Sequence, residues 1–161
     1  ESYDMFISCG ILFNHESPYR GLEFVTRKIT SEMAKIVTKK VDKIHLGNID
    51  AKRDWGFSGD YVKSMWMMLQ QENPSDYVVC TGESHSVKEF LEESFNYADL
   101  GDWQNYVEID EKYFRPIDID NLVGDSSKAR NKLGWKPEIK FKELVHLMVD
   151  HDLNIEKNRR R

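Results

Sequence analysis

The turn that follows the first apolar run of the chain gathers side chains suited to an anionic ligand. The run "MFISCGILF" is followed by "NHESPYRG". His15 can donate to a phosphate or a ribose hydroxyl, Asn14 offers a donor and an acceptor, and Arg20 can fork onto a phosphate. The alternative is that the same residues only shape a turn and cap the next helix. The turn is therefore a candidate binding loop.

Two later stretches add charged groups of the same kind. In "GNIDAKRDWGFSGDYV", Arg53 stands in a charge cluster beside Trp55, and a plain surface cluster would not need the aromatic ring. In "FRPIDIDNLVGD", Arg115 and Asp118 are suited to one arginine on a diphosphate and one carboxylate on ribose hydroxyls. A loop salt bridge between Arg115 and Asp118 is the simpler alternative. Both stretches join the candidate site.

These loops need a scaffold that brings them together, and the chain has the alternating pattern of an α/β fold. The run "MFISCGILF" predicts a strand buried on both faces, typical of a parallel sheet. Ligands bind such sheets at the carboxyl ends of the strands, where the first candidate loop lies. Further strands are predicted over 43–48, 76–82 and 105–110, and helices over 22–39, 58–71, 86–100, 126–135 and 141–157.

Several of these helices carry specific signals. The helix over 58–71 is rich in Met and aromatic residues, which we interpret as core. Ser86 and Glu89 have the spacing of a capping box at the start of the third helix. Gly134 is expected to end the fourth helix. Cys9 and Cys80 stand in apolar runs without metal-binding spacing, so we predict two reduced core thiols and an intracellular, cytoplasmic protein.

Composition limits the classes of function. The chain has 161 residues and a mass of 19.0 kDa, with 40% hydrophobic and 32% charged residues, as expected of a globular protein. Its 23 Lys and Arg against 28 Asp and Glu give a net charge of -5. A general affinity for nucleic acid or for anionic lipid is therefore not expected. No apolar span approaches the roughly 20 residues of a membrane helix.

Taken together, the stretches resemble the carboxyl-terminal half of the GDP-mannose 4,6-dehydratase family, within the extended short-chain dehydrogenases/reductases. The shared segments read "GILFNHESPYRG", "FVTRKI", "LGNIDAKRDWG", "DYVKSMWMMLQ", "TGESHSVKEF", "YFRPIDID" and "KLGWKP". They follow the order of the family and span nearly the whole chain. Tyr19 departs from the family pattern, which usually has arginine there, and Asp118 stands where glutamate is commoner.

The resemblance implies the carboxyl-terminal part of an extended Rossmann-type nucleotide-sugar dehydratase. Residues 1–21 would supply a late Rossmann strand and the cofactor and substrate loop. Residues 22–161 would supply the substrate-binding portion, interleaved with the remaining Rossmann elements, and the amino-terminal NADP-binding half would be missing. Matching positions assign NADP to His15 and Arg20, and GDP-mannose to Asn14, Val25, Lys28, Arg53, Arg115 and Asp118.

The reaction of the family would need groups that this sequence lacks. It oxidises mannose at carbon 4 with NADP, eliminates water across carbons 5 and 6, and returns the hydride to carbon 6, on the route to GDP-fucose. A glycine-rich first turn and a Tyr-x-x-x-Lys pair are required, and neither occurs here. We therefore expect a binding fragment without turnover, with the missing half or another copy of the chain as partner. A non-catalytic nucleotide-sugar-binding module, or a related reductase or epimerase, remains the alternative.

Overall fold

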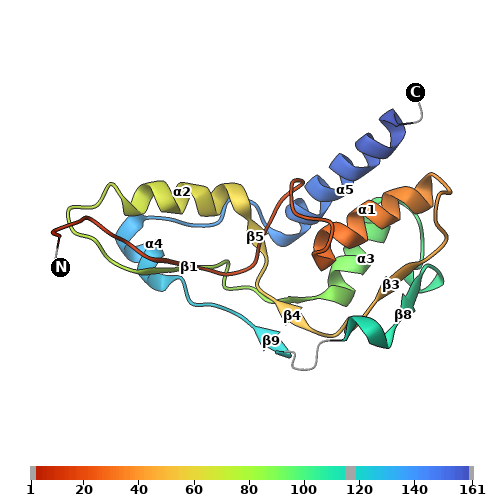
Figure 1. The fold of residues 1–161 in the computed structure, drawn as a ribbon, viewed down its shortest axis with the longest axis horizontal. Coiled ribbons are helices and arrows are strands. Elements are labelled where there is room, and N and C mark those ends of the chain that lie inside the picture. The colour runs from red at the N-terminus through yellow and green to blue at the C-terminus, as the bar shows by residue number, and fades with distance from the viewer. Residues whose placement is uncertain (1–2, 115–118, 160–161) are drawn as a thin grey trace.

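The computed structural model describes residues 3–114 and 119–159. The described chain is elongated, and its amino-terminal and carboxyl-terminal ends lie at opposite ends of the long axis (Figure 1). Its buried apolar side chains form two hydrophobic clusters. We call the parts built around them the large lobe and the small lobe. Arg115 and Asp118, which the sequence assigned to the substrate, lie outside the described residues.

The large lobe packs three helices over short strands. Helix α1 (Val25–Val37), α3 (Val87–Tyr97) and α5 (Phe141–Asn158) contact one another, and β3 (Ile44–Leu46) pairs in parallel with β8 (Val107–Ile109). Two short 3-10 helices flank β8, η1 (Trp103–Asn105) and η2 (Glu111–Tyr113). The core of this lobe consists of Ile29, Met33, Ile36, Ile44, Leu46, Trp55, Val87, Phe90, Leu91, Phe95, Trp103, Leu144, Val145, Met148 and Val149.

The small lobe is built on one parallel pair of strands. Strand β1 (Gly10–Leu12) pairs with β6 (Tyr77–Val79), and α2 (Ser58–Met68) and α4 (Ser127–Leu133) pack beside them (Figure 1). Its core consists of Tyr61, Met68, Tyr77, Val79, Ala129, Leu133 and Trp135. Gly134 follows α4 at φ 68°, a left-handed conformation that glycine adopts without strain, so the predicted end of this helix is confirmed.

Very short strands join the two lobes. Strand β2 (His15–Glu16) pairs in parallel with β5 (Gly56–Phe57). Strand β4 (Lys52–Arg53) lies between β7 (His85–Ser86), which is antiparallel to it, and β9 (Asn121–Leu122), which is parallel. Parallel pairs between strands far apart in the sequence confirm the predicted α/β class. Each predicted strand and helix forms, mostly with shorter bounds.

The capping box at the start of α3 also forms as predicted. The Ser86 hydroxyl accepts from the Glu89 amide at 3.0 Å, and the Ser86 amide donates to the Glu89 carboxylate at 2.6 Å. These two bonds satisfy backbone donors that a helix start leaves unpaired. Among the described residues, no helix is long and apolar enough to cross a membrane.

The prediction that "MFISCGILF" is buried on both faces is wrong for this chain. Only Gly10–Leu12 is in a strand, and the side chains of Met5, Ile7 and Ile11 are 62%, 59% and 57% exposed. Among the described residues β1 pairs with β6 alone, so its second edge and much of its surface stay open. Cys9 is consequently exposed rather than in the core, whereas Cys80 is a buried free thiol as predicted.

The prediction that the Met and aromatic residues of the helix over 58–71 are core residues is wrong for one face of that helix. Tyr61 and Met68 are buried in α2, but Trp66 is 64% exposed. Val62, Met65 and Leu69 are exposed as well, and with Trp66 they recur at the spacing of one helix face. We call these four residues the α2 apolar stripe. It is an apolar surface that nothing in the described chain covers.

A buried ion pair ties α1 to α5. Arg27 donates from Nε and Nη2 to the Asp152 carboxylate at 2.8–3.1 Å, and the Thr30 hydroxyl donates to the same carboxylate at 2.6 Å. Arg27 also donates from Nη1 to the carbonyls of Pro18 and Arg20. One guanidinium therefore links two helices to the predicted binding loop, with its charge paired inside the protein.

Replacing Asp152 by Ala should lower the free energy of unfolding by about 3–5 kcal/mol, because Arg27 would stay buried without an opposite charge. Urea denaturation followed by circular dichroism measures the loss. Asp150→Ala on the same helix is the matched control. Asp150 is exposed and accepts from the Tyr97 hydroxyl at 2.9 Å, so about 1 kcal/mol is expected. Equal losses in the two variants would contradict the role of the pair.

Candidate functional site

A cavity of about 480 Å³ opens beside the start of α1, where the two lobes join. Segments distant in the sequence form its walls: the loop after β1, the start of α1, the turn after β3, strand β4 and the end of η2. The lining residues are Asn14, Glu16, Leu22, Glu23, Phe24, Val25, Lys28, Glu32, Leu46, Gly47, Asn48, Ala51, Arg53, Trp55, Val87 and Tyr113.

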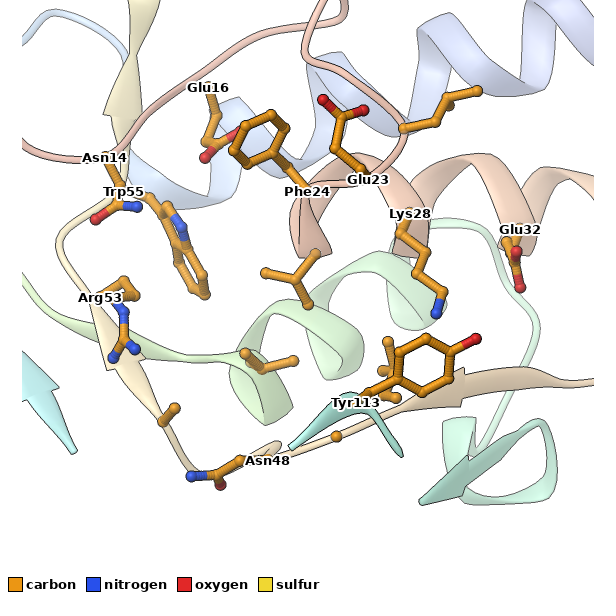
Figure 2. Close-up of a pocket in the computed structure, with 16 residues that line it drawn as sticks. Asn14, Glu16, Glu23, Phe24, Lys28, Glu32, Asn48, Arg53, Trp55 and Tyr113 are labelled. Atoms are coloured by element: carbon orange, nitrogen blue, oxygen red, sulfur yellow. The ribbon is translucent and has the colours of Figure 1, made fainter. Parts of the chain in front are cut away.

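Four of the residues that the sequence assigned to the substrate meet in this cavity. Asn14, Val25, Lys28 and Arg53 all line it. Figure 2 shows Asn14 and Arg53 on one side of the space and Lys28 on the other. These four residues come from three separate segments, so the fold, and not proximity in the chain, brings them together.

The two cationic side chains are held at the edges of the cavity. Lys28 donates from Nζ to the His45 carbonyl at 2.5 Å, and Nζ lies 3.8 Å from the centroid of the Tyr113 ring. Arg53 donates from Nη1 to the carbonyls of Lys52 at 2.7 Å and of Ile119 at 2.5 Å. Both side chains therefore have a defined place at the edge of the cavity, where a cationic group can attract an anion.

An apolar wall faces these charges. Trp55 is 3% exposed, and its ring packs at 5.6 Å from Phe90 and at 6.4 Å from Phe141. Asn14 lies next to Trp55 in the cavity, and its carbonyl accepts from the Gly56 amide at 3.0 Å. The cavity thus combines a rigid aromatic surface with polar groups that can fix the orientation of a ligand.

The residues assigned to the cofactor lie apart from this cavity. His15 donates from Nδ1 to the Phe13 carbonyl at 2.9 Å, and its ring lies 5.3 Å from that of Tyr61 on α2. Arg20 forms an ion pair from Nε to Glu16 at 3.3 Å. Neither residue lines the cavity, so the predicted separation of cofactor and substrate positions is compatible with the geometry.

Sequence reasoning missed several residues that line the cavity, among them Glu16, Glu32, Asn48 and Tyr113. Burial raises the pKa of Glu16, although a hydrogen bond from Thr26 and the charge of Arg20 oppose this effect. Glu32 could have been found from the sequence, because it follows Lys28 by one helical turn on the same face. Asn48 and Tyr113 carry no such signal, since their place depends on how β3 and η2 fold back.

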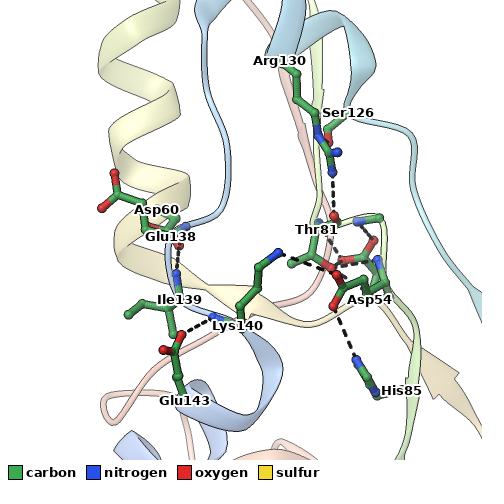
Figure 3. Close-up of polar contacts among 12 residues, drawn as sticks. Asp54, Asp60, Thr81, His85, Ser126, Arg130, Glu138, Ile139, Lys140 and Glu143 are labelled. Atoms are coloured by element: carbon green, nitrogen blue, oxygen red, sulfur yellow. Dashed lines mark hydrogen bonds and ion pairs between the residues drawn. The ribbon is translucent and has the colours of Figure 1, made fainter.

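The segment after Arg53 is anchored by a buried carboxylate. Asp54 accepts from the Thr81 amide at 2.8 Å, the Thr81 hydroxyl at 2.6 Å, the Gly82 amide at 2.9 Å and the Gly124 amide at 3.2 Å (Figure 3). This side chain is completely buried. Asp54 therefore joins β4 to two loops of the small lobe and fixes the backbone from which Arg53 reaches the cavity.

A second carboxylate fixes the start of α2. Asp60 accepts from the amides of Glu138 at 2.9 Å and Ile139 at 3.1 Å, and its carbonyl accepts from Trp135 Nε1 at 2.8 Å. Figure 3 shows this contact beside the Asp54 network. The charged residues noted beside Trp55 in the sequence are therefore partly structural. Arg53 faces the cavity, and Asp54 and Asp60 hold the fold around it.

The groups that line the cavity are suited to binding a ligand. Tyr61 is buried, and desolvation with nearby carboxylates raises its pKa far above the ordinary value, so it is no candidate base. In residues 3–114 and 119–159, no cluster of His, Cys, Asp and Glu has the geometry of a metal site. The cavity offers cations, an amide and an aromatic wall, which suit a ligand with phosphate, hydroxyl and ring groups.

Comparisons with known proteins agree with this arrangement. Residues 1–148 match the family model described as GDP-mannose 4,6 dehydratase. GDP-mannose 4,6 dehydratase 1 of Arabidopsis thaliana is 59% identical over 157 residues, which cover 98% of this chain and 43% of that protein. The human GDP-mannose 4,6 dehydratase is 47% identical over 171 residues, covering 96% of this chain and 46% of that protein.

Solved structures support the fold. RMD from Pseudomonas aeruginosa, complexed with NADPH, superposes with a TM-score of 0.84 at 20% identity, covering 93% of this chain and 49% of that one. The dTDP-glucose 4,6-dehydratase of Bacillus anthracis, in complex with NAD, superposes with a TM-score of 0.81 at 17% identity. The match covers 97% of this chain and 47% of that one. The chain spans less than half the length of the curated relatives reported above. With the family model matched over most of its length, this chain belongs to the GDP-mannose 4,6-dehydratase family.

Proposed function

We propose that this chain is the carboxyl-terminal, nucleotide-sugar-binding part of a GDP-mannose 4,6-dehydratase. The observation that carries the proposal is the meeting of Asn14, Val25, Lys28 and Arg53 in one cavity. Those four positions were assigned to GDP-mannose by family resemblance alone, and their common location supports the assignment. The whole protein would convert GDP-mannose to the 4-keto-6-deoxy sugar.

In this proposal the cations of the cavity bind the diphosphate. Lys28 and Arg53 approach the cavity from opposite sides, and a diphosphate carries the negative charges that they can neutralise. Arg115 and Asp118, which follow η2 in the sequence, are proposed to complete the same site. The aromatic wall around Trp55 offers a surface for a flat base or a sugar ring.

NADP is proposed as the cofactor, and it would supply the hydride acceptor when bound. His15 and Arg20 are the residues of this chain that would hold it. Arg20 tests the fit, because its Nε is a buried atom without a hydrogen-bond partner among the described residues and is held by the ion pair with Glu16 at 3.3 Å. A guanidinium held by one edge can present the other edge to a phosphate. The residues present are therefore compatible with this cofactor.

The exposed apolar surface supports a proposal about the partner. The α2 apolar stripe and the open edge of β1 are uncovered, and the relatives contain more than twice the length of this chain. We propose that the remaining, amino-terminal half of the protein covers this surface and adds strands beside β1. This proposal retains the division at residues 1–21 and 22–161, with the first segment completing the missing Rossmann sheet.

A soluble cytoplasmic homo-oligomer is also proposed for the whole enzyme. Cys9 and Cys80 are both free thiols, which is the usual state in a reducing compartment. The alternative function is a non-catalytic nucleotide-sugar-binding module. The absence of a Tyr-x-x-x-Lys pair from the sequence favours that alternative if the chain acts alone.

GDP should bind to the chain weakly, and Arg53→Ala should lower the affinity for GDP by roughly tenfold or more. A charge-assisted hydrogen bond contributes about 1.5–3 kcal/mol, and about 1.4 kcal/mol corresponds to a factor of ten. Calorimetric titration measures both affinities. Arg159→Ala, at the carboxyl end of α5, removes an arginine that pairs with Glu156 far from the cavity residues and should leave the affinity unchanged. Equal affinities for Arg53→Ala and the parent chain would remove Arg53 from the site.

Turnover is not expected from the chain alone. With GDP-mannose and NADP added, no 4-keto-6-deoxy product should form, because the acid–base pair that the reaction requires is missing from the sequence. Chromatography of the nucleotide sugars after prolonged incubation checks this expectation. Product above the blank without enzyme would show that other residues of this chain perform the chemistry.

The separately produced amino-terminal half should bind this chain through the α2 apolar stripe. Sedimentation velocity of the mixture should show a complex, and Trp66→Glu should weaken it, because a charge would be buried against an apolar partner. Lys88→Glu on the exposed side of α3 is the control and should not matter. Self-association of the chain that persists in the mixture would favour a second copy as the occupant instead.

A further inference from the structure

Glu16 is the least exposed charged group that borders the cavity. It belongs to β2, whose two residues point to opposite sides: His15 contacts Tyr61, and Glu16 faces the cavity and the start of α1 (Figure 2). Its side chain is only 2% exposed. Its Oε2 atom accepts a hydrogen bond from the Thr26 hydroxyl at 2.8 Å and forms an ion pair with Arg20 Nε at 3.3 Å. A carboxylate so deeply buried needs such partners.

Arg20 is fixed by this contact from one side and by an aromatic ring from the other. The guanidinium carbon of Arg20 lies 3.5 Å from the centroid of the Phe24 ring. Stacking and the ion pair together hold the plane of the guanidinium, although Nε itself has no hydrogen-bond partner in the part of the chain that the structure describes. The arginine is therefore oriented before any ligand binds.

The same contacts fix one wall of the cavity. Phe24, which carries the Arg20 charge on its face, lines the cavity together with Leu22, Glu23 and Val25. Thr26 follows directly in the first turn of α1 and is completely buried. Glu16 thus contacts both ends of the segment from Arg20 to Thr26, and the cavity wall lies between those ends.

We infer that Glu16 is a positioning residue, which orients Arg20 toward the cofactor side and the 22–25 wall toward the nucleotide-sugar side of the site. This inference rests on the proposed function, because it assigns the two sides by the ligands proposed there. One buried carboxylate then links the two parts of the site. A carboxylate that served stability alone would have no effect on ligand affinity beyond its effect on folding.

The ionisation of Glu16 provides a way to separate these two roles. Burial raises its pKa, and the Thr26 hydroxyl and the positive charges of Arg20 and His15 act in the opposite direction. Its carboxylate therefore takes up a proton at a higher pH than the ordinary value of about 4.3. Protonated Glu16 no longer attracts Arg20, so the affinity for a ligand that uses this wall should fall as the pH is lowered through that range.

The test compares Glu16→Gln with Glu93→Gln in the 161-residue chain. Glu93 is a matched control, because it is a mostly buried carboxylate that accepts from His146 at 2.7 Å and lies away from the cavity residues. GDP affinity is measured by calorimetry at pH 7 and at successively lower pH, as far as the parent chain stays folded. Glu16→Gln should lower the affinity for GDP by about fivefold to tenfold at pH 7. It should also remove a step from the dependence of that affinity on pH. Glu93→Gln should retain the parent profile, which includes the titration of GDP itself.

Hydrogen exchange gives a second readout that needs no ligand. Backbone amides over 17–28 should exchange faster in Glu16→Gln and unchanged in Glu93→Gln, because the Arg20 and Phe24 amides lie in the turns that Glu16 braces. Arg20→Gln, which changes a half-buried side chain, should reproduce both effects, and the double variant should add little to either single variant. If Glu16→Gln folds poorly, Arg20→Gln alone tests the same contact, because it removes the charge that Glu16 holds.

The outcomes distinguish this inference from the proposed function. If the parent chain binds no GDP, the proposed function fails. The hydrogen-exchange rates of the two variants then show whether Glu16 positions the 22–25 wall. If GDP binds and Glu16→Gln matches Glu93→Gln in affinity, pH profile and exchange, Glu16 is a structural carboxylate and the inference is overturned. Loss of affinity with an unchanged pH profile and unchanged exchange would overturn it as well.

Discussion

The buried pair of Arg27 and Asp152 is the constraint on which the binding region depends. An arginine can be accommodated inside a protein only where its charge and its donors are matched, and here Asp152 on α5 supplies the charge. The remaining Nη1 donors reach back to the carbonyls of Pro18 and Arg20. The turn that begins the cavity wall is therefore held by the packing of two helices, one of which lies near the end of the chain.

A second buried carboxylate performs the same task on the other side of the cavity. Asp54 gathers backbone amides from two loops and lies next to Arg53 in the chain. The two anchors differ in what they join: Asp152 fixes helices within the large lobe, whereas Asp54 ties a strand at the junction to the small lobe. The cavity lies between them, so its shape depends on both lobes being correctly packed.

This construction explains how the chain forms the cavity from its own elements. The cations, the amide and the aromatic wall lie on elements that this chain packs by itself, mainly α1, β3 and β4. The surfaces left open, the α2 apolar stripe and the free edge of β1, lie on the small lobe. The cavity and the exposed apolar surface are thus formed by different sets of residues, linked through β2 and β5.

The sequence by itself determined the local elements and the family. Capping of α3 by Ser86 and Glu89 and the end of α4 at Gly134 follow from backbone hydrogen bonding and from φ, which act over a few residues. The cavity residues Asn14, Lys28 and Arg53 were found because their segments are specific to the family. Local patterns of this kind are readable without knowledge of the rest of the chain.

Only the tertiary structure decided which apolar residues are covered and which charges are structural. Apolarity marks a residue as suited to burial, but burial needs a partner surface, and Trp66 and Ile11 have none in the described chain. Likewise Asp54 and Arg53 are neighbours in a charged stretch, yet one is buried by amides from distant loops and the other lines the cavity. The roles of Glu16 and Asp152 also arise from contacts with other segments, because the charge that pairs with a buried group depends on how the chain folds back.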